Sequence, residues 1–205
     1  MQRLFEASVN TLNNSAQETV VDGMARERQQ YSGDGAHQLH AIYHGFGETR
    51  LSARFINTFS MGLTHEGYFL DCWPAFDRLA RLMERQLNLT GWGPIVDHGI
   101  GFCFDSWYFY QYTGSADIIK GVFPRLIKFF NWLQTITDED GLLKVEELGV
   151  PSVWIDHVAY KNKGTSNVLS TFMLRLCACM PLPHCQEFLE KTPGLKKLKL
   201  LEMGY

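Results

Sequence analysis

The run DHGIGFCFDSWYFYQY, residues 97–112, decides the fold class of this 205-residue chain. Apolar and aromatic side chains surround the axis of a helix drawn through it, and the only interruptions are Asp97, His98, Asp105, Ser106 and Gln111. A helix that is apolar on nearly all sides lies in the interior of a protein. The run therefore predicts an inner helix.

The segment after this run has the pattern of an outer helix with one buried stripe. Apolar residues recur there at intervals of three and four, at Ile118, Ile119, Val122, Leu126, Phe129, Phe130 and Leu133. Ser115 is the expected N-cap, and Pro124 is expected to begin a second, longer helix, because proline suits the first turn. Inner and outer helices that alternate in this way predict an all-α toroid of helical hairpins. Residues 144–158 contain the best candidate strand, a short edge piece limited by Gly149 and Pro151.

The composition excludes several classes of partner. The net charge is -3 and the pI is about 6.2, so the chain lacks the basic balance typical of nucleic-acid binders. No apolar run reaches the roughly 20 residues that span a bilayer. Residues 1–14 lack the long apolar core of a signal peptide. We therefore expect a cytoplasmic protein that binds neither nucleic acid nor membrane.

The segment VDGMARERQQYSGD, residues 21–34, carries the candidate chemistry. It holds three acids and two arginines in a stretch that glycines break. Such a loop can direct several carboxylates at one point, as sugar chemistry requires: one acid protonates the leaving oxygen while the others hold ring hydroxyls. The alternative is a solvated loop whose arginines pair locally with its acids.

This segment resembles the Asp-x-x-x-Arg-Glu-Arg-x-x-x-x-Gly-Asp loop of the α-L-rhamnosidases of glycoside hydrolase family 78. The similarity continues through residues 107–114, 124–126 and 138–143 and ends near Trp154-Ile155-Asp156-His157. The resemblance implies a partial (α/α)6 six-hairpin catalytic domain. It also implies hydrolysis of terminal α-L-rhamnosides with inversion, a carbohydrate substrate, and neither a metal nor a cofactor.

Site residues follow from the resemblance position by position. Glu27 corresponds to the general acid, Asp22 and Asp34 to the carboxylates that bind hydroxyls, and Arg26 to a positioning residue. Four further residues correspond to the sugar pocket: Asp97, His98, Trp154 and Asp156. The family often has Asp-Trp where this chain has Asp97-His98, and a histidine offers less stacking surface than a tryptophan.

Metal binding is an alternative for two other groups of residues. His37, His40 and His44 share a face of an expected helix, and Cys177 lies one residue from Cys179. Neither group supplies the pattern of a zinc site, because the histidines have no acid in register and the cysteines have no second pair.

The resemblance stops at Lys161, so we expect a catalytic domain over residues 1–161 and an unrelated tail over residues 162–205. Pro181 and Pro183 interrupt what should be a further helix. A change of reading frame near residues 162–165 is our hypothesis for this tail. We further expect a truncated chain without the general base, and therefore with little activity. The alternatives are an inactive remnant, a sugar-binding protein, or a toroid hydrolase that acts on another sugar.

Overall fold

The computed structural model describes residues 1–23, 27–74, 94–148 and 153–154. These residues form α-helices and one short 3-10 helix, and they contain isolated β-bridges rather than strands. The elements are α1 (Gln2–Ser15), α2 (Ser32–Phe46), α3 (Arg50–Ser60), α5 (Val96–Thr113), α6 (Asp117–Thr135) and η1 (Val145–Leu148). Over this part of the chain the predicted all-α class is confirmed.

Four of the helices form two hairpins, α2 with α3 and α5 with α6. Gly47 and Gly114 end the first helix of each hairpin with φ of 62° and 66°, a left-handed conformation that glycine adopts without a steric penalty. Their backbone N–H groups donate to the carbonyls of Tyr43 and Tyr110. Short turns then reverse the chain, so that consecutive helices are antiparallel.

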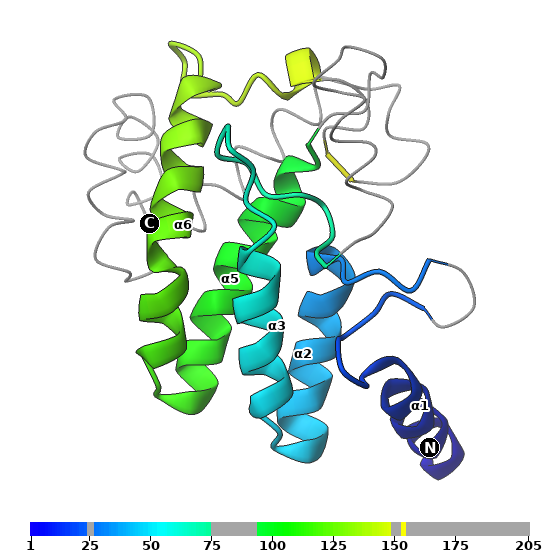
Figure 1. Cartoon of the computed structure of the whole chain (residues 1–205). Coiled ribbons are helices and arrows are strands. Elements are labelled where there is room, and N and C mark those ends of the chain that lie inside the picture. Colours follow the sequence, from blue (N-terminus) through cyan, green and yellow to red (C-terminus); the bar gives the residue numbers. More distant parts are fainter. Residues whose placement is uncertain (24–26, 75–93, 149–152, 155–205) are drawn as a thin grey trace, which may run out of the picture.

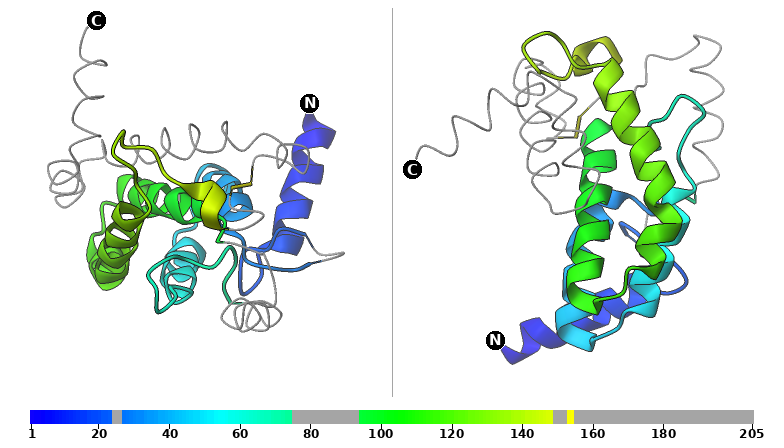
Figure 2. Two further views of the ribbon diagram at one scale, coloured as in Figure 1. Left: turned by 90° about the horizontal axis from the view of Figure 1, so that it is seen from above. Right: turned by 90° about the vertical axis from the view of Figure 1, so that its left-hand side faces the viewer.

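The two hairpins pack side by side in two layers. Helix α2 packs chiefly against α5, and α3 against α6. Figure 1 shows the four helices with similar axial directions, and the view from above in Figure 2 separates the α2–α5 layer from the α3–α6 layer. Helix α1 stands to one side of them, with Leu4 and Phe5 exposed. Paired hairpins of this kind constitute part of a six-hairpin toroid.

Aromatic side chains form the centre of the core. Phe59, Phe69, Phe102 and Phe129 are fully buried, and they come from α3, the segment after it, α5 and α6. Their rings lie in a chain of contacts, with centroids 4.8 Å apart for Phe59–Phe102 and 5.1 Å for Phe69–Phe102 and Phe69–Phe129. Offset and edge contacts between aromatic rings at this separation are favourable beyond the area that they bury.

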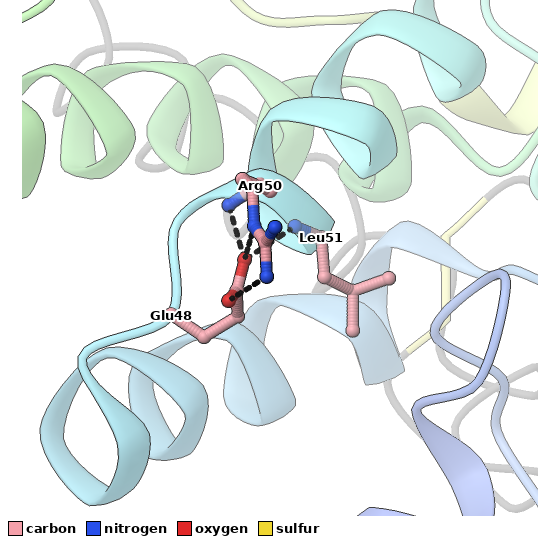
Figure 3. Close-up of polar contacts among 3 residues, drawn as sticks. All are labelled: Glu48, Arg50 and Leu51. Atoms are coloured by element: carbon pink, nitrogen blue, oxygen red, sulfur yellow. Dashed lines mark hydrogen bonds and ion pairs between the residues drawn. The ribbon is translucent and has the colours of Figure 1, made fainter.

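The start of α3 is capped by a side chain from the turn before it. Glu48 Oε1 accepts hydrogen bonds from the backbone N–H of Arg50 at 2.5 Å and of Leu51 at 3.2 Å, and the Arg50 guanidinium pairs with Oε2 (Figure 3). The first backbone N–H groups of a helix have no partner within the helix. The Glu48 carboxylate therefore supplies acceptors that α3 would otherwise lack.

Three local predictions were wrong. Helix α6 is a single helix whose N-cap is Ala116, not Ser115, and Pro124 lies inside it. Pro124 cannot donate to the Lys120 carbonyl four residues before it. The Arg125 guanidinium donates to the next carbonyl, that of Gly121, at 3.3 Å. Residues 145–148 form η1 instead of an edge strand, since the described residues offer no neighbouring strand to pair with. Within the described residues, no helix combines the length and apolar character needed to cross a bilayer.

Candidate active site

The acid segment forms a loop that is closed at its neck. The backbone N–H of Asp22 donates to the Gln29 carbonyl at 3.0 Å, and the Gln29 N–H donates to Asp22 Oδ1 at 2.8 Å. Glu27 lies inside this loop. Its neighbour Arg28 has a φ of 53°, which is uncommon for a side chain other than glycine. The Asp22 carboxylate thus closes the loop that carries Glu27.

The end of this loop is fixed to the segment that follows α3. The Gln30 carbonyl accepts from the Trp73 N–H at 3.1 Å, and Gln30 Nε2 donates to the Trp73 carbonyl at 2.6 Å and to Thr58 Oγ1 at 3.0 Å. Gln30 is 2% exposed, so these bonds lie out of competition with water. Helix α2 begins two residues later, and its first turn carries Asp34.

His98 joins three segments at the start of α5. Its Nδ1 lies 3.1 Å from the Asp71 carbonyl, and because a carbonyl only accepts, Nδ1 carries the proton. The backbone carbonyl of His98 accepts from Ser32 Oγ at 2.5 Å, and its ring meets the edge of Tyr31. Nε2 then faces the first turn of α2, where a Cβ added to Gly33 would lie 3.0 Å from it.

The charges of the other two candidate carboxylates act on Asp34. Partial burial raises the pKa of Asp34, the charge of His98 opposes that rise, and the charges of Asp22 and Glu27 add to it. A charge shifts a carboxyl pKa only when it lies near that carboxyl. Asp22 and Glu27 therefore lie near Asp34, whose helix α2 begins beside α5, where Ser32 donates to the His98 carbonyl.

Asp97 and Trp154 meet at the same end. Asp97 Oδ1 accepts a hydrogen bond from the backbone N–H of Trp154 at 3.0 Å. Burial raises the pKa of Asp97, whereas the His98 charge and the Trp154 N–H favour its ionised form. The Trp154 side chain is 39% exposed and is thus available to a ligand. Arg26 and Asp156, the remaining candidates, lie outside the described residues.

Sequence reasoning missed the residues that hold this site together. Gln30, Ser32 and Asp71 carry no charge pattern or motif of their own. The first two lie within the quoted acid segment, but nothing in the sequence pairs Gln30 with Trp73 or Ser32 with His98. These contacts depend on tertiary packing between segments far apart in the chain.

Two of the three histidines of α2, His40 and His44, pack against tyrosines. The His40 ring lies 4.6 Å from that of Tyr108, and His44 Nε2 is hydrogen-bonded to the Tyr112 hydroxyl. Burial lowers the pKa of His40, and the charges of His44 and His37 lower it further. In the part of the chain that the structure describes, no three His, Cys, Asp or Glu side chains are placed to hold a metal ion.

A groove of about 620 Å³ runs between α1 and α2. Its walls are mainly apolar, from Leu4, Phe5, Leu12 and Phe46, with Asp22 also among its lining residues. Glu27 and Asp34 do not line it. The groove therefore touches the edge of the carboxylate cluster and does not contain it.

The arrangement suits chemistry on a polyol. Asp22, Glu27 and Asp34 supply hydrogen-bond acceptors and a potential proton donor, while Asp97, His98 and Trp154 supply a polar and aromatic wall beside them. The acid loop carries Asp22 and Glu27, and the first turns of α2 and α5 carry Asp34, Asp97 and His98. Trp154 is held beside α5 by its bond to Asp97. Carboxylates gathered beside paired helical hairpins are typical of an all-helical glycosidase domain.

A family model described as the bacterial alpha-L-rhamnosidase 6 hairpin glycosidase domain matches residues 1–174. The match includes every candidate site residue named above. The chain therefore belongs to this family of α-L-rhamnosidase six-hairpin glycosidase domains, and its substrate is a carbohydrate. Neither the curated proteins nor the solved structures gave a significant match.

Proposed function

We propose that this domain serves the hydrolysis of terminal α-L-rhamnosides with inversion, and that Glu27 is the general acid. Asp22 and Asp34 hold hydroxyls of the sugar, and Arg26 positions the reacting groups. Asp97, His98, Trp154 and Asp156 complete the sugar pocket. The observation that carries the proposal is the influence of the Asp22 and Glu27 charges on Asp34, because a general acid has to share a pocket with the groups that hold its sugar.

The chemical step follows from these roles. The Glu27 carboxyl gives its proton to the glycosidic oxygen as the bond from that oxygen to the anomeric carbon breaks. Water attacks the opposite face of the sugar and passes a proton to a base. Inverting enzymes separate this base from the acid by roughly 6.5–9.5 Å. The proposal assigns the base to no residue of this chain.

The test uses purified chain and aryl α-L-rhamnosides whose leaving groups differ in basicity. Azide is added because a small anionic nucleophile needs no general base to attack the anomeric carbon. With azide, the chain should form the β-rhamnosyl azide. Glu27→Gln should slow this reaction by roughly 10²–10⁴-fold for a basic leaving group. It should change the rate little for a nitrophenolate, which leaves without protonation.

Asp140→Asn is the matched control, because Asp140 is exposed and far along the chain from the acid loop. It should leave both rates unchanged. Equal effects of Glu27→Gln on activated and basic leaving groups would assign the general acid elsewhere. A chain that binds rhamnose but gives no azide product would be a sugar-binding domain without turnover.

A further inference from the structure

The apolar groove between α1 and α2 is not used by the acid chemistry described above. Its volume of about 620 Å³ suits a small organic molecule, since such ligands occupy clefts of roughly 300–1,000 Å³. Large apolar side chains on its walls are open to solvent, because Leu4, Phe5 and Phe46 are 70%, 63% and 45% exposed. Apolar patches of this kind beside polar residues mark binding surfaces.

One end of the groove is fixed to the acid loop. Val21, the residue before Asp22, bonds to both walls. Its backbone N–H donates to the Ser15 carbonyl at the end of α1 at 3.2 Å, and its own carbonyl accepts from Gln38 Nε2 of α2 at 2.8 Å. Ser15, Asp22 and Gln38 all line the groove. The groove therefore begins at the neck of the loop that carries the candidate acid.

The α2 wall of the groove continues the helix face that carries Asp34. Residues three and four apart share one face of a helix. His37 and Gln38 follow Asp34 by three and four positions. Ala41 lies one turn further along, and it lines the groove together with His37 and Gln38. A ligand whose sugar lies at Asp22 and Asp34 can therefore extend along this face.

The groove is polar at the acid loop and apolar away from it. Phe46 lies roughly 13 Å beyond His37 along α2, because a helix rises about 1.5 Å per residue. On α1, Leu4 and Phe5 lie about three turns from Ser15, which is at the acid-loop end. Neither lysine nor arginine is among the described lining residues. The groove thus suits an amphiphile with a polar head at the acid loop and an uncharged apolar tail.

We propose that this groove binds the aglycone of the substrate, and that the aglycone is an uncharged apolar group such as an alkyl chain or linked aromatic rings. The inference rests on the proposed function, because that function places the sugar at Asp22 and Asp34. The glycosidic oxygen that Glu27 protonates then lies where the two parts meet. Burial of the aglycone against Phe5 and Phe46 removes apolar surface from water and supplies binding energy remote from the bond that breaks.

The test measures binding of methyl, butyl and hexyl α-L-rhamnosides to the purified chain by titration calorimetry. Each added methylene that enters the groove should lower the Kd by up to about fourfold. This measurement requires no turnover. A Kd that stays constant from the methyl to the hexyl glycoside would overturn the proposal.

Two substitutions locate the effect in the groove. Phe5→Ser and Phe46→Ser change exposed side chains, so the core stays intact. Each should weaken binding of the hexyl glycoside roughly tenfold and leave that of the methyl glycoside unchanged. Met61→Ser is the matched control, because Met61 is 50% exposed and does not line the groove. It should change neither affinity. Equal losses for both glycosides in Phe5→Ser would overturn the proposal.

Hexyl α-D-mannoside separates a failure of this inference from a failure of the proposed function. If the hexyl mannoside and rhamnoside bind equally and Phe5→Ser weakens both, the apolar groove stands and the assignment of rhamnose falls. If methyl rhamnoside binds selectively but the hexyl chain adds nothing, the sugar site stands and the aglycone site falls. A dimer that Phe5→Ser converts to a monomer in sedimentation would assign the groove to a second copy of the chain and overturn the proposal.

Discussion

Trp154 donates its backbone N–H to Asp97 Oδ1 at 3.0 Å, a bond between residues 57 positions apart that places an exposed indole at the start of α5. Asp97→Ala should release this contact, whereas Asp97→Asn keeps an oxygen acceptor. Because such a bond contributes about 1 kcal/mol, hydrogen exchange at the Trp154 amide should accelerate about fivefold in the alanine variant. Equal exchange in Asp97→Ala and the unmodified chain would show that Asp97 does not hold Trp154.

Substitution by alanine should have opposite effects on stability at two glycines of α2, Gly35 and Gly45. A Cβ on Gly35 would lie 2.4 Å from Phe55 Cε2, while a Cβ on Gly45 would meet nothing within 4 Å. Gly35→Ala should therefore destabilise the fold by roughly 1–3 kcal/mol through overpacking. Gly45→Ala should stabilise it by about 0.5–1 kcal/mol, because alanine favours the helix. Urea denaturation measures both, and a stable Gly35→Ala variant would mean that α2 and α3 are farther apart.

Gly33 lets His98 approach the first turn of α2. In Gly33→Ala the new Cβ would lie 3.0 Å from His98 Nε2, and the ring cannot turn freely because Nδ1 is bonded to the Asp71 carbonyl. The affinity for rhamnose, measured by titration calorimetry, should fall roughly tenfold, equivalent to 1.4 kcal/mol. Gly101→Ala is the control, since its nearest neighbour would be Ser32 Oγ at an ordinary 3.7 Å. Unchanged affinity in Gly33→Ala would remove His98 from the sugar pocket.

Glu48 predicts a stability change at acid pH. Hydrogen bonds from the Arg50 side chain and then from backbone N–H groups lower the pKa of Glu48 below its ordinary value of 4.5. Its contribution is therefore complete above that value and disappears as pH falls through the lower pKa of the folded state. Glu48→Ala should cost about 0.5–2 kcal/mol at pH 7, the usual range for a lost helix cap, and less below pH 4.

Thermal unfolding across this pH range measures the Glu48 effect. Glu66→Ala serves as the control, because Glu66 is exposed and lies in the loop after α3. It should leave the unfolding temperature nearly constant. A Glu48→Ala penalty of the same size at pH 3 and pH 7 would show that the carboxylate charge does not stabilise α3.

Helical periodicity was sufficient to predict the class of this fold. The run at residues 97–112 predicts a buried helix, and α5 does bury Ile100, Phe102 and Phe109. It does not bury all of its aromatic residues, since Tyr110 and Tyr112 are about two-fifths exposed. Periodicity reports which side chains suit an interior, but the neighbouring helices decide how far each face is covered. The prediction that Pro124 begins a new helix was wrong for a similar reason. Packing of the apolar face can stabilise a helix that lacks one backbone hydrogen bond.

The candidate site was predictable only where its residues carry a motif. The acid segment was recognisable as a unit, and the charges of Asp22 and Glu27 do act on Asp34. The residues that anchor this segment could not be predicted. Gln30 bonds to Trp73 through its side-chain amide, and Asp71 bonds to His98 through its backbone carbonyl, and no local sequence pattern specifies either contact. Contacts of this type arise from the way the two hairpins pack, which periodicity alone does not define.

The turns of the two hairpins also bear on the order of folding. Gly47 and Gly114 reverse the chain within a few residues, so each hairpin forms through contacts that are local in sequence. The bonds from Ser32 to His98 and from Gln30 to Trp73 close loops of 66 and 43 residues. Closing a longer loop costs more entropy, so the hairpins should form first and the acid loop should be fixed last. The acid loop would then also be the first region to open, at a free energy below that of global unfolding.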